Sequence, residues 1–135
     1  MGAVRSPIEA VCRQADFISI NLPLIPTTRG VVNADLLRQM KPTAYVINMA
    51  RGPLWKEADV FKALQEGRIA GAGADVFEEE PASASNPLFT LDNFIGSPHM
   101  SAHTDEGMMR MSMVAQDVLA VLEGRQPEFP VPENC

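Results

Sequence analysis

Short apolar runs alternate with helix-length segments along this chain, and this alternation limits the possible folds more than any other feature. Four runs read as buried strands: residues 16–20, 44–48, 70–76 and 94–97. Helices are expected around and between them, over residues 7–14, 34–40, 56–66 and 104–124. Strands that alternate with helices need crossover connections, which produce a parallel sheet. The sequence therefore predicts an α/β fold, a parallel sheet with helices on both faces.

Capping residues predict where the helices begin. Ser6 precedes Pro7 and has Glu9 three residues later, an arrangement typical of a capped helix start. Asn33 and Thr104 stand directly before two further helical segments, where their side chains are expected to accept hydrogen bonds from free backbone N–H groups.

Composition and charge exclude several classes of function. With 135 residues and 46% hydrophobic residues, the chain is long enough for one domain with a core. The net charge of −6 and the scattered basic residues disfavour a nucleic-acid or anionic-membrane partner. No apolar run approaches the roughly 20 residues that span a bilayer. Cys12 and Cys135 lack metal-ligand spacing, so we expect free thiols, no metal site and a cytoplasmic location.

Three side chains that can take part in catalysis each follow one of the apolar runs: Arg51, Glu80 and His99. In an open α/β sheet, ligands bind outside the carboxyl ends of the strands, because the loops there converge on one crevice. A guanidinium, a carboxylate and an imidazole at one such edge suit chemistry on a small anionic carbonyl compound.

A series of short motifs makes the chain resemble a known family. The motifs are ADFISINLPL at residues 15–24, MKP at 40–42, VINMARG at 46–52, AGAGADVF at 70–77, EP at 80–81, NPL at 86–88, DN at 92–93 and SPH at 97–99. In this order, over about four-fifths of the chain, they resemble the later half of the NAD-binding domain of the D-isomer-specific 2-hydroxyacid dehydrogenases.

The resemblance implies a role for each site residue. Arg51 would clamp the substrate carboxylate and polarise its carbonyl, since a planar guanidinium presents paired donors. His99 would be the acid/base that exchanges the hydroxyl proton, with Glu80 as the carboxylate that holds its imidazole. Asp75 would bond the nicotinamide carboxamide. The cofactor-binding positions that the match implies are Pro23, Thr28, Asp75 and Ser101.

Two of these assignments have an alternative within the sequence. The acidic run at residues 78–80 is normally a solvated loop, and Glu80 is selected by its position before a proline and its spacing from Asp75. Glu79 is the other candidate for the histidine's partner. His103 matches His99 in type but stands at a helix start, where a structural role is favoured.

The chain also departs from the family pattern. The Gly-x-Gly-x-x-Gly turn between a strand and a helix is absent, and Gly71 and Gly73 lie within a strand instead. Residues 1–135 are therefore expected to be a partial Rossmann-type NAD-binding domain, without the glycine-rich first βαβ unit and the substrate domain. It would be a fragment, a truncated gene product or one of two chains. Trp55 and Lys56 replace the small apolar residue and the acid that the family usually has.

The function that the resemblance implies is hydride transfer between NAD(H) and a small 2-hydroxy or 2-oxo acid, with NADP left open. The isolated chain is expected to be inactive, and the full-length parent is expected to be a homodimer. The alternative is a non-catalytic, NAD-sensing interaction protein, like the family's corepressor members, which retain the same three residues. Formate dehydrogenase is disfavoured because Glu80 stands where that relative has glutamine. The sequence does not identify the 2-hydroxy acid.

Overall fold

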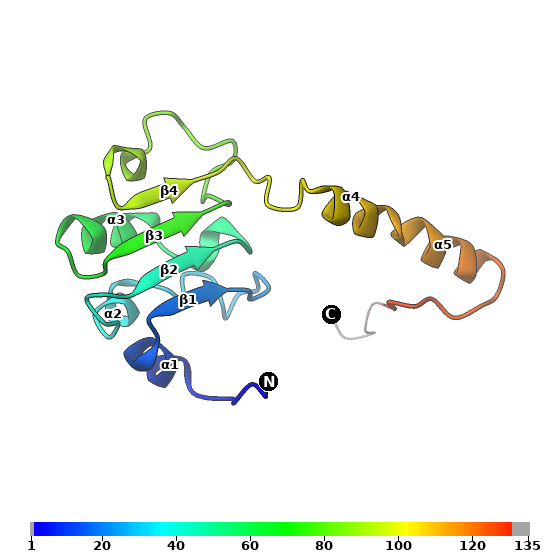
Figure 1. Cartoon of the computed structure of the whole chain (residues 1–135), viewed down its shortest axis with the longest axis horizontal. Helices are drawn as coiled ribbons and strands as arrows, with labels where there is room; N and C mark the ends of the chain where they lie inside the picture. The colour runs from blue at the N-terminus through cyan, green and yellow to red at the C-terminus, as the bar shows by residue number, and fades with distance from the viewer. Residues whose placement is uncertain (1, 131–135) are drawn as a thin grey trace. The chain divides into compact units, whose positions relative to one another are not determined.

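The computed structural model of the chain describes residues 2–130, which divide after Met100 into two compact units. The first unit contains a sheet with its helices, and the second contains two further helices (Figure 1). Cys135, one of the two expected free thiols, lies outside the described residues.

Four parallel strands form the sheet of the first unit (Figure 1). In chain order they are β1 (Phe17–Ile20), β2 (Tyr45–Asn48), β3 (Gly71–Ala74) and β4 (Phe94–Gly96). Their order across the sheet is also β1-β2-β3-β4. The pairing places Ile18 beside Val46, Val46 beside Ala72, and Ala72 beside Phe94. The predicted α/β fold with a parallel sheet is confirmed.

One helix precedes β1, and the other helical segments of the first unit connect the strands. The helices are α1 (Ile8–Gln14), α2 (Ala34–Leu37) and α3 (Glu57–Gln65), with two 3₁₀ turns, η1 (Gly52–Leu54) and η2 (Pro87–Thr90). The side chain of Asn33 accepts hydrogen bonds from two backbone N–H groups at the start of α2, as predicted. The predicted cap at Ser6 is wrong, because Pro7 occupies the cap position of α1 and no side chain caps that helix.

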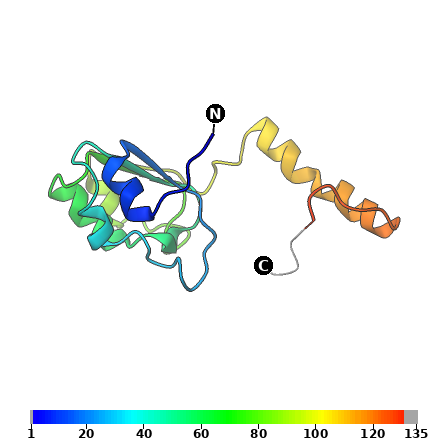
Figure 2. The ribbon, with the colours of Figure 1, turned by 90° about the horizontal axis from the view of Figure 1, so that it is seen from below.

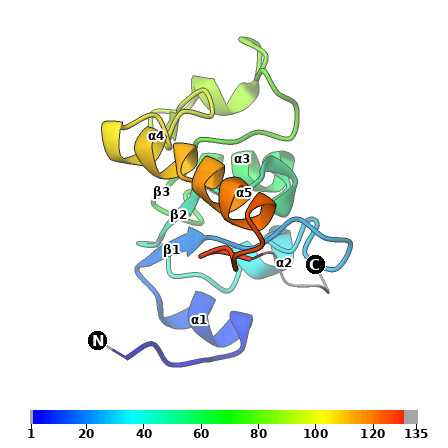
Figure 3. The same cartoon turned by 90° about the vertical axis from the view of Figure 1, so that its right-hand side faces the viewer.

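The helices of the first unit cover one face of the sheet. Figures 2 and 3 show α2 and α3 on the same side of the strands, and α1 packs against α2. The predicted second layer of helices is not present within residues 2–100. The reason is the strand order: every crossover advances in the same direction across the sheet, and right-handed crossovers in one direction place all their helices on one face.

The covered face contains the hydrophobic core. Val46 and Val60 are fully buried there, as are Leu54, Leu88 and Trp55. Trp55, a departure from the family pattern, forms an isolated parallel bridge with Val32 and belongs to the core cluster. On the opposite face of the sheet, which we call the open face, the side chains of Phe17, Tyr45 and Ile95 are exposed.

The second unit contains α4 (Asp105–Ser112) and α5 (Val114–Leu122), which replace the single helix predicted over residues 104–124. Thr104 caps α4 as predicted, since its hydroxyl accepts a hydrogen bond from the Gly107 N–H. Both helices carry exposed apolar side chains. None of the helices in the described range is long and apolar enough to cross a membrane.

Candidate active site

Asn48, the last residue of β2, builds the turn that presents Arg51. Its buried side-chain amide donates to the carbonyl oxygen of Arg51 at 2.9 Å, and its Oδ1 accepts from the Ala50 N–H at 3.2 Å. The guanidinium of Arg51 is exposed and donates to the carbonyl oxygen of Ala50 at 2.6 Å. The turn thus fixes the backbone of Arg51 at the carboxyl edge of the sheet and leaves its side chain accessible.

Gly52 brings this turn into backbone contact with the loop that carries Glu80. A Cβ at Gly52 would overlap the carbonyl oxygen of Phe77 and would lie 2.6 Å from the backbone nitrogen of Glu78. Only glycine permits this close approach. The loops that hold Arg51 and Glu80 are therefore packed directly against each other.

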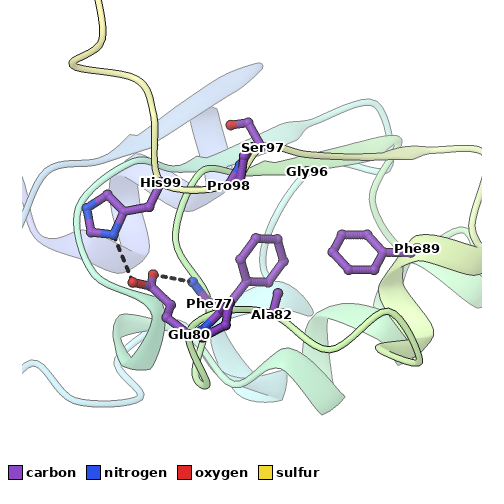
Figure 4. A pocket seen from close by; sticks show the side chains of 9 residues that line it. Phe77, Glu80, Ala82, Phe89, Gly96, Ser97, Pro98 and His99 are labelled. Carbon is purple, nitrogen blue, oxygen red and sulfur yellow. Dashed lines mark hydrogen bonds and ion pairs between the residues drawn. The ribbon is translucent and has the colours of Figure 1, made fainter.

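His99 is placed by an uncommon backbone conformation. Its φ of 51° lies in the left-handed region, which few residues with a Cβ adopt, although histidine is enriched there. Its N–H donates to the carbonyl oxygens of Asp75 at 2.8 Å and Ser97 at 3.1 Å, and these bonds stabilise the turn. The imidazole Nδ1 lies 2.8 Å from Oε2 of Glu80 (Figure 4).

Glu80 is held by two hydrogen bonds. Its Oε2 faces His99, and its Oε1 accepts from the Phe77 N–H at 3.0 Å (Figure 4). The hydrogen bond with His99 lowers the pKa of Glu80 most, the Phe77 N–H lowers it further, and the charge of Arg51 adds a smaller effect. Glu80 is therefore ionised at neutral pH, and Arg51 lies within electrostatic reach of it. Among the described residues, Glu79 makes no hydrogen bond to the imidazole.

A cavity of about 500 Å³ opens beside this pair (Figure 4). Glu80 and His99 line it together with apolar side chains, among them Phe77 and Phe89, whose ring centroids are 5.4 Å apart. Arg51 is not one of its lining residues. The cavity places the imidazole and the carboxylate at the wall of a largely apolar space.

Three of the four predicted cofactor positions lie in the first unit, in segments that follow its strands. Asp75 is buried after β3, where its Oδ1 accepts from the Ser97 hydroxyl at 2.5 Å and from the Met100 N–H at 2.9 Å. After β1, the Thr28 hydroxyl donates to the Pro23 carbonyl at 2.6 Å and so closes that loop on itself. The fourth position, Ser101, is the first residue of the second unit.

Sequence reasoning missed two groups that organise this site. The role of Asn48 could have been inferred from the sequence, because it is a polar residue that ends an apolar run. The role of the Phe77 N–H could not be inferred, because every residue except proline carries a backbone N–H. Within residues 2–130, no cluster of three or more His, Cys, Asp or Glu side chains is arranged to hold a metal ion.

Comparison with known proteins identifies the family. Residues 1–101 match the NAD binding domain of the D-isomer specific 2-hydroxyacid dehydrogenases. The chain is 43% identical over 122 residues to a D-3-phosphoglycerate dehydrogenase of Methanocaldococcus jannaschii, a match that covers 90% of this chain and 23% of that protein. It is 42% identical over 121 residues to a glyoxylate reductase of Thermofilum pendens, with 89% and 36% covered.

A solved structure supports the same assignment. It is the NAD complexed form of a D-isomer specific 2-hydroxyacid dehydrogenase from Lactobacillus delbrueckii ssp. bulgaricus, with a TM-score of 0.80 and 30% identity over 94% of this chain and 43% of that chain. The chain thus spans less than half the length of each of these three relatives. Since the family's domain matches residues 1–101 of 135, the chain belongs to the NAD-binding domain family of the D-isomer specific 2-hydroxyacid dehydrogenases.

Proposed function

We propose that this chain forms part of an oxidoreductase that transfers hydride between NAD(H) and a small 2-hydroxy or 2-oxo acid. The observation that carries the proposal is the pair of His99 and Glu80, 2.8 Å apart at the ends of the strands, with the charge of Arg51 in reach. Because the chain spans only part of its relatives' length, the activity is proposed for the protein that also contains a substrate domain.

Arg51 binds the substrate in this proposal. Its guanidinium can donate two parallel hydrogen bonds to the carboxylate of a 2-oxo acid, and its charge draws electron density toward the adjacent carbonyl oxygen. The hydrogen bonds to the carboxylate hold the bound substrate throughout the reaction. The attraction of the guanidinium for the carbonyl oxygen grows as that oxygen gains negative charge. The exposed position of Arg51 on the turn built by Asn48 leaves the guanidinium free to turn toward a substrate.

His99 carries the proton. In reduction, the protonated imidazole donates a proton to the carbonyl oxygen while that carbon receives hydride. In oxidation, the neutral imidazole takes the proton of the hydroxyl group. Glu80 holds Nδ1, so that Nε2 is the nitrogen left to face the substrate.

The nicotinamide would supply or accept the hydride when it is bound. Pro23, Thr28, Asp75 and Ser101 would line its site. The buried carboxylate of Asp75 suits an amide donor such as the nicotinamide carboxamide. A pyrophosphate, in contrast, needs backbone N–H groups at a glycine-rich helix start, and the sequence contains no such turn. The residues present therefore fit the nicotinamide end of a dinucleotide, and the choice between NAD and NADP stays open.

A chimaera tests the proposal. Residues 1–135 would replace the matching segment of the Thermofilum pendens glyoxylate reductase, and NADH oxidation would be followed with glyoxylate, hydroxypyruvate and pyruvate. We expect saturable turnover. Arg51→Ala should raise KM and lower kcat, while His99→Ala should mainly lower kcat. A folded chimaera that binds NADH without turning over any 2-oxo acid would support the non-catalytic, NAD-sensing alternative instead.

The kcat of the chimaera assigns the carboxylate. Because Oε2 of Glu80 lies 2.8 Å from Nδ1 of His99 and so orients the imidazole, Glu80→Gln should lower kcat with little change in KM. Glu79→Gln is the matched control, since it removes the same charge from the same loop. An unchanged kcat in Glu80→Gln would identify another carboxylate as the partner of His99.

The isolated chain provides a second test. We propose that the 135 residues alone have negligible dehydrogenase activity, because they supply no cradle for the pyrophosphate. Turnover near that of a typical enzyme, on the order of 10 per second, would contradict this. The full-length protein is further proposed to be a cytoplasmic homodimer, which size-exclusion chromatography with light scattering and cell fractionation would test.

A further inference from the structure

Two carboxylates outside the proposed catalytic set hold the loop that carries Glu80. Glu57 is the first residue of α3, and Glu78 follows β3 in the chain. The Glu57 N–H donates to Oε1 of Glu78 at 2.8 Å, and the Glu78 N–H donates to Oε1 of Glu57 at 2.6 Å. We call this reciprocal pair of bonds the clasp. Each side chain accepts the other residue's backbone proton.

Glu57 also holds the far end of the same loop. Its second oxygen, Oε2, accepts from Nδ2 of Asn86 at 2.7 Å. The Oδ1 of Asn86 in turn accepts from the Leu88 N–H at 3.0 Å and caps η2. One carboxylate therefore binds the loop where it leaves the sheet and where it enters the next helical turn, and Glu80 lies between these two points.

The clasp adjoins the atoms that bind Glu80. Glu78 directly follows Phe77, whose N–H donates to Oε1 of Glu80. Two carboxylates would repel each other at this point if they were not compensated. Both accept backbone N–H groups, and Glu57 lies in the first turn of α3, where the helix dipole favours negative charge.

We propose that Glu57 is a positioning residue: by binding both ends of the loop, it places the carboxylate of Glu80 within hydrogen-bonding distance of the His99 imidazole and the Phe77 N–H. The inference rests on the proposed function only in taking the His99–Glu80 pair as catalytic. The position of the Glu80 carboxylate is a separate claim, and it can be measured without any assay of activity.

The measurement is the titration of the Glu80 carboxyl carbon by ¹³C NMR. The sample is the 135-residue chain labelled at its glutamate carboxyl carbons, with the signal assigned through Glu80→Gln. In the native chain the pKa of Glu80 is lowered by its hydrogen bonds to His99 and Phe77 and by the charge of Arg51. Loss of positioning weakens these bonds, so Glu57→Ala should raise the pKa of Glu80 toward its ordinary value.

The sign of the shift separates positioning from simple charge removal. Deleting a neighbouring negative charge without moving Glu80 would lower the pKa of Glu80, because less repulsion opposes its ionisation. Glu79→Gln, which removes a charge from the same loop but breaks no hydrogen bond, is the matched control and should not raise that pKa. A lowered or unchanged pKa of Glu80 in folded Glu57→Ala would overturn the proposal.

A milder variant keeps the test decisive if Glu57→Ala does not fold. In Glu57→Gln the side-chain oxygen still accepts from the Glu78 N–H, whereas the new amide NH₂ cannot accept from Asn86. The pKa of Glu80 should then rise by a smaller amount than in Glu57→Ala, and the absence of any rise would again overturn the proposal. An inactive chimaera would count against the proposed function and would leave this titration unaffected.

Discussion

The two faces of the sheet differ in how they are packed, although the same strands form both. On the covered face, Val46 and Phe94 are 0% and 8% exposed. On the open face, their neighbours Tyr45 and Ile95 are 44% and 78% exposed. Strands of parallel sheets are normally buried on both sides and are therefore apolar on both. The open face has the side chains of an interior surface, and the helices of residues 2–100 cover only the other side.

The largest expected difference between the faces is in stability. Ile20 on the covered face is 4% exposed and Ile95 on the open face is 78% exposed. The same isoleucine-to-alanine substitution can therefore be compared at a buried and at an exposed position. Ile20→Ala should lower the free energy of unfolding by about 2–5 kcal/mol, because it leaves a cavity in the core. Ile95→Ala should change it by about 0.5 kcal/mol or less. Urea denaturation measures both, and equal losses would show that the open face is packed in solution.

The open face should also make the isolated chain associate. Besides its exposed apolar side chains, β1 lies at the sheet edge and presents backbone groups that can pair with another chain. We expect binding of an apolar dye and concentration-dependent light scattering, both reduced in the double variant Phe17→Lys and Ile95→Lys. A sharply melting, dye-silent monomer at high concentration would contradict this prediction.

A thiol on the covered side gives a smaller, local test. Cys12 is buried in the core cluster, and burial raises the pKa of its thiol, with Glu9 raising it further and Arg13 partly opposing. Since the thiolate is the reactive form, the native chain should react slowly with a thiol reagent at pH 8 and rapidly in urea. Fast reaction in the native state would mean that the covered face opens readily.

The smallest expected effect concerns the loops at the strand ends, which carry the candidate site. Because the pKa of Glu80 is lowered in the folded chain, its ionised form contributes stability above its unfolded pKa. That contribution is lost as the pH falls through the folded value. On acidification below the ordinary value of 4.5, the native chain should therefore lose slightly more stability than Glu80→Gln. Parallel acid-unfolding curves for the two proteins would contradict this.

Much of the fold could be predicted from local patterns in the sequence. The apolar runs mark the strands, and Asn33 and Thr104 mark two helix starts because a side-chain cap is a local interaction. The single covered face could not be predicted in this way, since it depends on the order of the strands and the handedness of the crossovers. The prediction of a cap at Ser6 was wrong because Pro7, whose φ angle is fixed by its ring, occupies the N-cap position of α1.

The candidate site was predicted by residue type more than by geometry. The motif selected Glu80 over Glu79, and the structure pairs Glu80 with His99. The left-handed backbone of His99 and the bonds from Glu57 were not predictable, because they depend on contacts between residues far apart in the chain.

The contact at Gly52 has a consequence for how this site can change. Because the Arg51 turn and the Glu80 loop touch through their backbones, neither can shift without displacing the other. Substitutions in the two loops should then be strongly epistatic: a combinatorial library that varies both would yield functional pairs that neither single library contains. Natural or laboratory evolution of a new substrate preference through these loops would have to proceed by coordinated steps.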